Sequence, residues 1–288
     1  MLTLVRGRQL HLDHLVAGLK AQTRQPDELV VAYMQDDPPR LPDDTAFAIR
    51  TVCVPGEPMP LARARNSAAA KASGSIYAFL DVDCIPDPDF VRRAVEATHT
   101  APDGVFLPEV RYLPGRAGNW RTEAGGPPDY RDLEKAGERH PAKPNLDAAA
   151  ILPIDDFGEL WGLAFIMRAA TWDAAGGMDE AYIGYGAEET DFGRRLEASG
   201  ASLYWLGGTV CYHQHHNVHK PPLQHFDSIV RNARLFRERW GEWCMDYWLE
   251  DFACRGLIRR DADTLDVLRR PSGAEVAATA QGPDVRFS

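Results

Sequence analysis

Two aspartates follow a short apolar run and could hold a metal ion. Asp81 and Asp83 come directly after Ile76-Tyr-Ala-Phe-Leu80, which is typical of a buried parallel strand. Ligands of open α/β sheets bind at the carboxyl ends of the strands. Oxygen ligands suit Mg²⁺ or Mn²⁺, which could also bridge a diphosphate. The alternative is an aspartate-rich turn that precedes the helix expected at Asp87–Thr98.

A second group of carboxylates could do acid–base chemistry. Glu188, Glu189 and Asp191 lie within about one turn of an expected helix. A carboxylate close to an acceptor hydroxyl can take its proton as a general base, and clustering predicts a raised pKa for at least one of the three. Alternatively, acidic residues in a first turn only complement the helix dipole, worth about 0.3–1 kcal/mol each. The lead-in Gly184-Tyr-Gly186 favours the catalytic interpretation.

A cluster of histidines follows a predicted strand further along the chain. The segment Val210-Cys-Tyr-His-Gln-His-His-Asn217 holds three of the nine histidines. In a strand, His213 and His215 would face one side and His216 the other. Imidazole combined with carboxylate favours Mn²⁺. An independent zinc site of His213, His215 and His219, or a polar loop with surface imidazoles, are the alternatives.

The order of these motifs resembles that of GT-A glycosyltransferases of family 2, and of the β1,4-galactosyltransferase-like branch in particular. The resemblance is carried by Phe79-Leu-Asp-Val-Asp-Cys-Ile-Pro86, Ala62-Arg-Ala-Arg-Asn66, Val5-Arg-Gly-Arg-Gln-Leu-His-Leu12, Trp161-Gly-Leu-Ala-Phe-Ile-Met167, Gly176-Gly-Met-Asp-Glu180 and Gly184-Tyr-Gly-Ala-Glu-Glu-Thr-Asp-Phe-Gly-Arg-Arg195. It implies a GT-A fold, an α/β architecture with a mostly parallel central sheet flanked by helices.

The resemblance also implies an activity. A hexose or N-acetylhexosamine would pass from a nucleotide-diphosphate sugar, with UDP favoured, to a hydroxyl acceptor. A single displacement with inversion is expected, although related families with an acidic loop that retain configuration leave retention open. Tyr185, Ala187 and Thr190 depart from the galactosyltransferase pattern, where tryptophan, glycine and aspartate stand, and this puts the sugar specificity in doubt.

Residue roles follow from the resemblance position by position. Glu189 would be the catalytic base, with Asp191 as the competitor for that role. Mn²⁺ or Mg²⁺ would be held by Asp83, His213 and His215. The residues expected to bind substrate are Arg6, Arg8, Arg63, Asn66, Asp81, Trp161, Gly162 and Glu188.

The elements that must position these residues alternate between strand and helix, which predicts a mostly parallel sheet. We expect strands at Leu2–Val5, Glu28–Tyr33, Phe47–Val54, Ile76–Leu80, Val105–Tyr112, Glu159–Met167, Ala201–Leu206 and Thr209–Tyr212. We expect helices at Gln9–Gln22, Leu61–Lys71, Asp87–Thr98, Trp172–Ala175 with Thr171 as N-cap, and Ala187–Ser199, and two amphipathic helices within Leu223–Arg239 and Glu242–Ile258.

The chain divides by pattern into a GT-A domain at 1–219, C-terminal helices at 220–270 and a disordered tail at 271–288. Residues 114–147 are rich in proline, glycine and charge, which indicates a flexible loop on the acceptor side.

Composition limits the choice of partners. The 288 residues carry 32 basic and 42 acidic side chains, a net charge of -10, which argues against a nucleic-acid-binding surface. An acidic protein that handles a diphosphate usually needs a cation between the two. The expected partners are a nucleotide-sugar donor and a glycan or small-molecule acceptor, and a homo-oligomer is left open.

The five cysteines are odd in number and lack CxxC spacing, which favours free thiols in a reducing cytosol. No apolar run approaches the roughly twenty residues of a membrane span, and Met1–Val5 is too short for a signal peptide. We therefore expect a cytoplasmic enzyme.

Two other classes of protein remain as alternatives. A nucleotidyltransferase should carry a glycine-rich phosphate loop after its first strand, and Val5-Arg-Gly-Arg8 is a poor version of one. A non-catalytic nucleotide-sugar-binding module would not need the carboxylates of Asp83 and Glu189.

Overall fold

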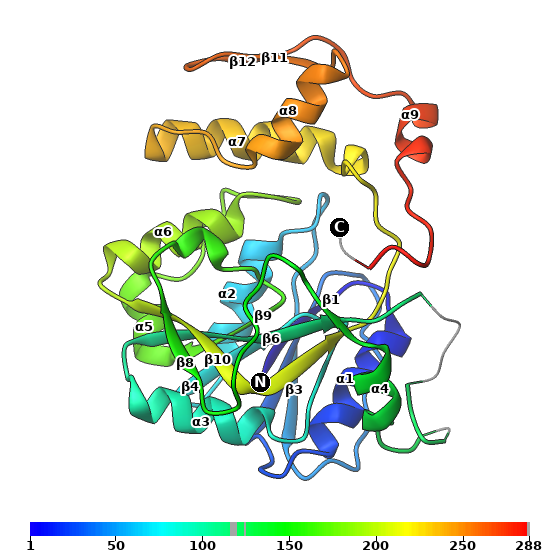
Figure 1. Ribbon diagram of the computed structural model, residues 1–288, viewed down its shortest axis with the longest axis vertical. Helices are drawn as coiled ribbons and strands as arrows, with labels where there is room; N and C mark the ends of the chain where they lie inside the picture. Colours follow the sequence, from blue (N-terminus) through cyan, green and yellow to red (C-terminus); the bar gives the residue numbers. More distant parts are fainter. Residues whose placement is uncertain (116–119, 124, 287–288) are drawn as a thin grey trace.

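The computed structural model describes residues 1–115, 120–123 and 125–286, and its centre is a large sheet (Figure 1). The strands lie in the order β3-β2-β1-β4-β9-β6-β10-β5, with β7 beside β6 and β8 beside β10. Their bounds are β1 Leu2–Val5, β2 Glu28–Tyr33, β3 Ala48–Cys53, β4 Ile76–Leu80, β5 Cys84–Pro86, β6 Gly104–Tyr112, β7 Glu138–Arg139, β8 Ile151–Ile154, β9 Ala164–Arg168 and β10 Ser202–His213.

Most of these strands run in one direction. β3, β2, β1 and β4 pair in parallel. β9 is antiparallel to both β4 and β6, so β6 points the same way as β4, and β10 is parallel to β6. The expected mostly parallel central sheet is confirmed.

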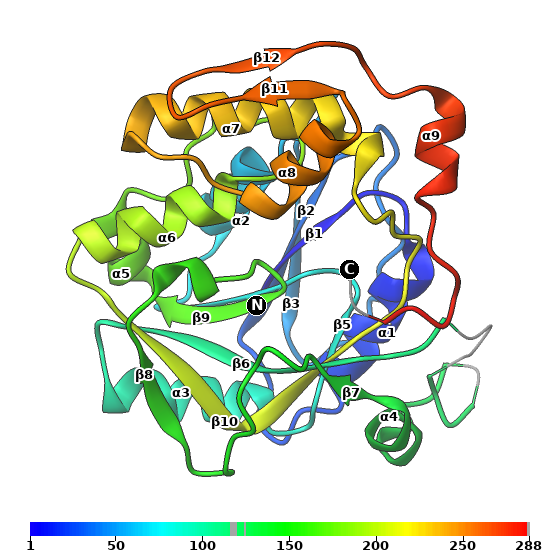
Figure 2. The same ribbon diagram turned by 45° about the horizontal axis from the view of Figure 1, so that its top comes forward.

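Helices cover both faces of the sheet (Figures 1 and 2). They are α1 Gln9–Lys20 and α3 Phe90–Thr100 on one face, and α2 Leu61–Lys71, α5 Ala169–Ala175 and α6 Glu188–Ala198 on the other. Side chains alternate along a strand, so β4 contributes Tyr77 and Phe79 to the core under α2 and α5, and Ala78 and Leu80 to the core under α1 and α3.

The edge of the sheet near β10 differs from expectation. The two strands expected at 201–206 and 209–212 form the single strand β10, whose register with β6 shifts between Leu206 and Val210. Gly208 has a φ of +75° inside this shift, a conformation that favours glycine. The two-glycine interruption therefore bends one strand and does not end it. β8, which the sequence did not predict, pairs with β10.

Two further boundaries were wrong. The strand expected at 159–167 begins only at Ala164, because residues 157–159 form the short 3-10 helix η1, Phe157–Glu159. Thr171 is not an N-cap, since α5 begins at Ala169 and buries Thr171 within its first turn.

Part of the segment expected as a flexible loop is ordered. It contains α4, Tyr130–Ala136, whose first turn is capped by the side chain of Asp129, and then β7, which pairs with β6. Residues 116–119 and 124 of the segment lie outside the described residues. Its placement on the acceptor side stays a prediction.

The C-terminal part forms a layer above the sheet with an apolar core of its own (Figures 1 and 2). Its elements are η2 Leu223–His225, α7 Phe226–Trp240, α8 Asp246–Cys254, β11 Ile258–Arg260, β12 Leu265–Val267 and α9 Gly273–Ala278. The helix expected within 242–258 is α8, and a β11–β12 hairpin follows it.

The disorder expected for residues 271–288 is wrong for α9. Ser272 and Glu275 form a capping box at the start of this helix, which satisfies backbone N–H groups that would otherwise be orphaned. The division of the chain at residue 219 stays a prediction. Within the described ranges, no helix is both long and apolar enough to span a bilayer.

Candidate active site

The pairing of two strands brings the aspartates to the histidines. β4 ends at Leu80, and after a tight turn β5 pairs antiparallel with the end of β10, with Cys84 opposite His213. Asp83, one residue before Cys84, therefore lies beside the histidine segment, although about 130 residues separate them in the chain. The backbone N–H of Gln214 donates to the carbonyl of Asp83 at 2.7 Å and fixes this contact.

Asp83, His213 and His216 form a group that could hold a metal ion. Nε2 of His213 lies 3.4 Å from Oδ1 of Asp83, and Nε2 of His216 lies 3.5 Å from Oδ2. One ligand atom from each of the three residues can be chosen so that all lie within 4.8 Å of one another. Oδ1 of Asp83 is buried and has no hydrogen-bond partner among the described residues. One carboxylate and two imidazoles form a ligand set that suits Mn²⁺.

The structure places His216 in this group and His215 outside it. The expected alternation fails because β10 ends at His213, so residues 214–217 no longer follow the two-residue repeat of a strand. His215 instead uses its backbone carbonyl, which lies 3.1 Å from Nε2 of His11. His219 contacts Val276 and Thr279 of the C-terminal layer, so the alternative zinc set is not brought together.

Arg8 supplies positive charge at the same aspartate. Its Nη1 lies 2.5 Å from Oδ2 of Asp83. Burial alone would raise the pKa of Asp83, but the charges of His213, His216 and Arg8 outweigh it and hold that pKa below its ordinary value. Arg6, the other arginine of the loop after β1, pairs with Glu57.

A buried arginine that the sequence analysis did not select joins the two acidic motifs. Nη2 of Arg65 lies 3.4 Å from Oδ1 of Asp81 and 3.1 Å from Oε1 of Glu189, and Nη1 lies 4.0 Å from Glu188. Arg65 could have been found from helical spacing, because it shares the buried face of α2 with Ala62, Ala68 and Ala69. A charged residue on an apolar helical face needs a buried partner.

Arg63 and Asn66, which flank Arg65 in α2 and were expected to bind substrate, contact other parts of the chain in this structure. Arg63 is exposed and donates to the carbonyl of Pro55. Asn66 exchanges two hydrogen bonds with the backbone of Met178, which ties α2 to the loop before the acidic helix.

The environment of Arg65 perturbs two carboxyl groups. Burial raises the pKa of Asp81 to about 7, opposed by Arg65 and reinforced by the charges of Asp83 and Glu189. Burial also raises the pKa of Glu188 to about 7, with Glu189 adding to the effect and Arg65 opposing it. Glu188 is therefore one member of the acidic cluster with the raised pKa that clustering predicts.

The three acidic residues of α6 have different surroundings. Glu188 is buried, whereas the side chain of Glu189 is 30% exposed. Asp191 is buried and accepts hydrogen bonds from Nε1 of Trp240 at 2.9 Å and from the hydroxyl of Tyr182 at 3.2 Å. Burial raises the pKa of Asp191, and these two hydrogen bonds oppose the shift. Glu189 is the carboxylate of this cluster that a substrate could reach.

Gly162 makes room for Glu189. A Cβ atom at residue 162 would lie 1.8 Å from Oε1 of Glu189 and 2.5 Å from Nη2 of Arg65. The preceding Trp161 is 36% exposed, which is unusual for a tryptophan. Carboxylate and arginine thus meet at Gly162, and the exposed Trp161 directly precedes this glycine in the chain.

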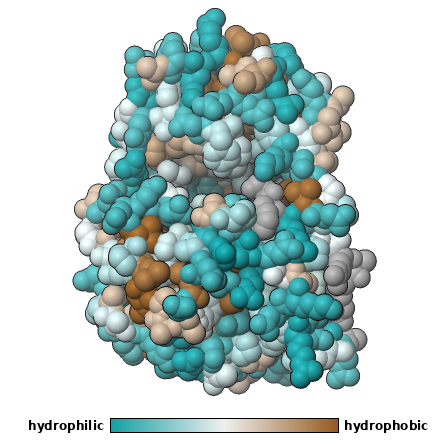
Figure 3. Space-filling view, viewed as in Figure 1, coloured by the Kyte–Doolittle hydropathy of each residue, from teal (hydrophilic) through white to brown (hydrophobic). Residues whose placement is uncertain are grey.

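The C-terminal layer holds the loop that leads into α6. The side-chain amide of Asn232 in α7 donates to the carbonyl of Gly186 at 2.8 Å and to that of Ile183 at 3.3 Å. Ala187, directly before Glu188, has a φ of +72°, a strained value for a residue other than glycine. Figure 3 shows the surface hollowed between this layer and the sheet below.

Comparison with known protein families shows which family the chain belongs to. The family described as glycosyl transferase family 2 matches residues 8–172, which is more than half of the chain. The chain belongs to glycosyl transferase family 2. A second family, described as the N-terminal domain of galactosyltransferase, matches residues 150–220, the region of Trp161, the acidic helix and the histidines.

A curated relative of this family 2 chain is the validoxylamine A glucosyltransferase of Streptomyces hygroscopicus subsp. limoneus. The two are 27% identical over 222 residues, which cover 68% of this chain and 47% of the relative. The chain thus spans about half the length of the curated relative that it matches.

Solved glycosyltransferases share the fold. A structure of GalNAc-T7 with UDP, GalNAc and Mn²⁺ has a TM-score of 0.54 at 14% identity and covers 75% of this chain and 42% of its own. TarS of S. aureus has a TM-score of 0.54 at 14% identity and covers 89% of this chain and 43% of its own. The chain has the expected GT-A fold, and its membership of glycosyl transferase family 2 argues against the nucleotidyltransferase alternative.

Proposed function

We propose that this family 2 enzyme transfers a hexose or N-acetylhexosamine from a UDP sugar to a hydroxyl acceptor, with a divalent metal ion and with inversion. The observation that carries the proposal is the position of Arg65. Its Nη2 atom lies within 3.4 Å of both Asp81 and Glu189. One guanidinium thereby connects the aspartates expected to bind the donor with the carboxylate expected to act on the acceptor.

The residues that would hold the metal ion are Asp83, His213 and His216, and the buried Oδ1 of Asp83 accepts no hydrogen bond from any described residue. When bound, Mn²⁺ or Mg²⁺ would supply positive charge to the leaving diphosphate. A relative was solved with UDP and Mn²⁺, which supports the choice of nucleotide and ion.

The remaining roles belong to side chains of this enzyme. Arg8 lies on Asp83 and would bind the diphosphate through its guanidinium, whose planar donors match phosphate oxygens. Arg65 orients the carboxylate of Glu189 through their contact at 3.1 Å. Because it is partly exposed, Glu189 can accept the proton of the acceptor hydroxyl.

The sugar is then transferred in a single step, in which one bond to the anomeric carbon forms as another breaks. The acceptor oxygen forms a bond to the anomeric carbon as its proton passes to Glu189. The bond from that carbon to the phosphate oxygen breaks, and UDP leaves with the electron pair. Attack from the side opposite the leaving group inverts the configuration.

A titration of UDP into the enzyme, with and without Mn²⁺, tests the proposal. We expect measurable binding with Mn²⁺ and a loss of at least about tenfold without it. His216→Ala should remove most of the Mn²⁺ effect, whereas the matched variant His215→Ala should keep it, because His215 lies outside the metal group. Equal affinity for UDP with and without Mn²⁺ would contradict a metal-bridged donor.

A cytoplasmic location also remains a proposal. All five cysteines are free, as expected in a reducing compartment.

A further inference from the structure

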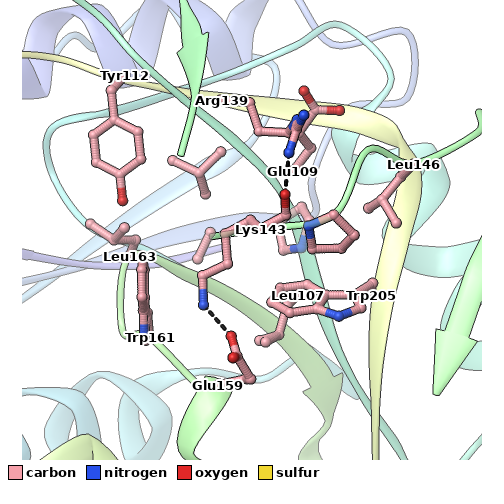
Figure 4. A pocket seen from close by; sticks show the side chains of 14 residues that line it. Leu107, Glu109, Tyr112, Arg139, Lys143, Leu146, Glu159, Trp161, Leu163 and Trp205 are labelled. Atoms are coloured by element: carbon pink, nitrogen blue, oxygen red, sulfur yellow. Dashed lines mark hydrogen bonds and ion pairs between the residues drawn. The ribbon is translucent and has the colours of Figure 1, made fainter. Parts of the chain in front are cut away.

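A mostly apolar pocket opens beside Trp161, next to the neighbouring strands β6 and β10, and the proposed reaction makes no use of it (Figure 4). Its apolar and aromatic walls include Leu107, Tyr112, Leu146, Trp161, Leu163 and Trp205. Pockets lined by apolar and aromatic side chains with a few polar groups are the usual binding sites for small molecules.

The charged groups at this pocket are already paired. Lys143 forms an ion pair with Glu159, and its Nζ lies 3.3 Å from the centre of the Trp161 ring (Figure 4). Arg139 donates to the backbone carbonyl of Lys143. Glu109, the other charged residue in the wall, accepts from Nε of Arg111 at 2.7 Å.

A charged ligand would have to break one of these pairs or leave a buried charge without a partner, which is costly. An uncharged ligand needs neither. The chemistry of the walls therefore selects a flat, apolar and neutral group that can pack against the aromatic and aliphatic side chains left open beside Lys143, whose Nζ lies over the Trp161 and Trp205 rings.

The pocket borders the reacting groups. Trp161 is followed by Gly162, and the space at Gly162 is filled by the carboxylate of Glu189. Tyr112, which also lines the pocket, has its ring centre 5.1 Å from that of His213. A ligand in contact with Trp161 would therefore lie one residue along the chain from the glycine that faces the proposed base.

We propose that this pocket binds a neutral, flat, apolar substituent of the acceptor, such as an aryl group attached to the sugar or alcohol that carries the reacting hydroxyl. The inference rests on the proposed function, since it assumes that Glu189 acts on the acceptor. It adds the acceptor class: hydroxyl compounds with an apolar ring, bound more tightly than the same compounds without it.

Calorimetry on the full chain tests this with pairs of ligands. The probes are the phenyl and methyl β-glycosides of glucose, galactose and N-acetylglucosamine. For at least one sugar, the phenyl glycoside should bind about tenfold more tightly than the methyl glycoside, since burial of one aromatic ring is sufficient for this factor.

Two variants act on the pocket in opposite ways. Trp205→Ala removes an aromatic wall, and Leu146→Trp fills the space. Both should reduce the preference for phenyl over methyl to about twofold or less. Trp243→Ala is the matched control, because Trp243 is a half-buried tryptophan that donates to the carbonyls of Asp261 and Ala262 in the C-terminal layer. This variant should keep the preference.

The inference is overturned if phenyl and methyl glycosides bind equally or undetectably, or if the preference survives both Trp205→Ala and Leu146→Trp. Metal-dependent binding of UDP is measured separately in the same preparation. If UDP binding requires the metal while the phenyl preference is missing, the proposed function stands and the pocket inference fails.

Discussion

Glu189 and Asp191 compete for the role of base, and their contacts separate them. Glu189 is partly exposed and lies 3.1 Å from Arg65. Asp191 is buried and accepts hydrogen bonds from Tyr182 and Trp240. A base must reach a substrate hydroxyl, whereas a buried carboxylate with two donors is suited to joining elements of structure.

We therefore expect Glu189→Gln to lower sugar transfer by about 10²–10⁴ while binding of UDP with Mn²⁺ is retained. Turnover and UDP affinity are measured on the same preparation. Asp191→Asn serves as the comparison, and should lower the melting temperature more than it lowers turnover. Near-normal turnover in Glu189→Gln together with a collapse in Asp191→Asn would show that Asp191 is the base.

Glu188 gives a pH dependence of stability. Burial raises its pKa from an ordinary 4.5 to about 7. Between these two values the unfolded chain has released the proton while the folded chain keeps it, so rising pH favours unfolding. The destabilisation is absent below about pH 4.5 and complete above about pH 7, where it amounts to at most about 3 kcal/mol.

Glu188→Gln removes this ionisation. Relative to the unaltered enzyme, the variant should gain stability as the pH rises from 4.5 to 7, with no further gain above 7. Urea unfolding at several pH values measures the difference. Glu197→Gln, an exposed position on the same helix, is the control and should show little trend. A constant difference for Glu188→Gln across this range would contradict a raised pKa.

At the residue scale, sequence reasoning selected side chains that lie close together where a motif stands next to a predictable element, and their roles stay predictions. Asp83 and His213 were both named, and the structure places them 3.4 Å apart. His216 was missed because strand alternation was extended past the end of β10. Helical spacing places Arg65 on the buried face of α2, and this could have been predicted. Arg65 was still missed, because its three acidic partners come from two distant motifs.

At the scale of elements, α7 controls the entry into the acidic helix. Asn232 is fully buried, and its side-chain amide donates to the carbonyls of Ile183 and Gly186 in the loop before Glu188. The strained backbone at Ala187 persists only if its surroundings hold it. Asn232 is therefore a positioning residue for the acidic cluster.

Asn232→Ala should leave buried carbonyls unpaired and cost about 1–3 kcal/mol of stability. Because the loop would relax, kcat should fall while the affinity for UDP with Mn²⁺ is retained. Denaturation and steady-state kinetics measure the two effects. A variant that loses stability at unchanged kcat would assign Asn232 a purely structural role.

Most strands of the sheet and the helices that cover it were predictable, because their apolar residues repeat at the spacing of a strand or a helix. α2 and β4 match the expected bounds, as do β1 and β2. β8 was not predicted, since its four residues, Ile151–Ile154, stand in a stretch without periodicity and gain their strand conformation by pairing with β10.

At the scale of the whole molecule, the chain returns from the C-terminal layer to the sheet (Figure 1). The backbone of Gln281 donates to Val218 at 2.9 Å, and Gly115 donates to Pro283 at 2.7 Å. Arg286 pairs with Glu138 of β7 at 3.2 Å. Composition predicted disorder here because the residues are small and polar, and contacts this distant in sequence leave no local pattern.

These contacts join the tail to the segment around α4 and β7, and their loss gives the last prediction. Removal of residues 271–288 should lower the melting temperature by at least about 3 °C and speed up proteolytic cleavage within residues 120–147, because α9 and the bonds to Gly115 and Glu138 disappear together. Arg286→Ala removes only the contacts of Arg286, including its ion pair with Glu138, so it should lower the melting temperature and speed up cleavage to a smaller extent. Mass spectrometry of the fragments locates the cuts. Unchanged cleavage within 120–147 after the truncation would mean that the tail lies on this segment without stabilising it, and that β6 alone holds β7 in place.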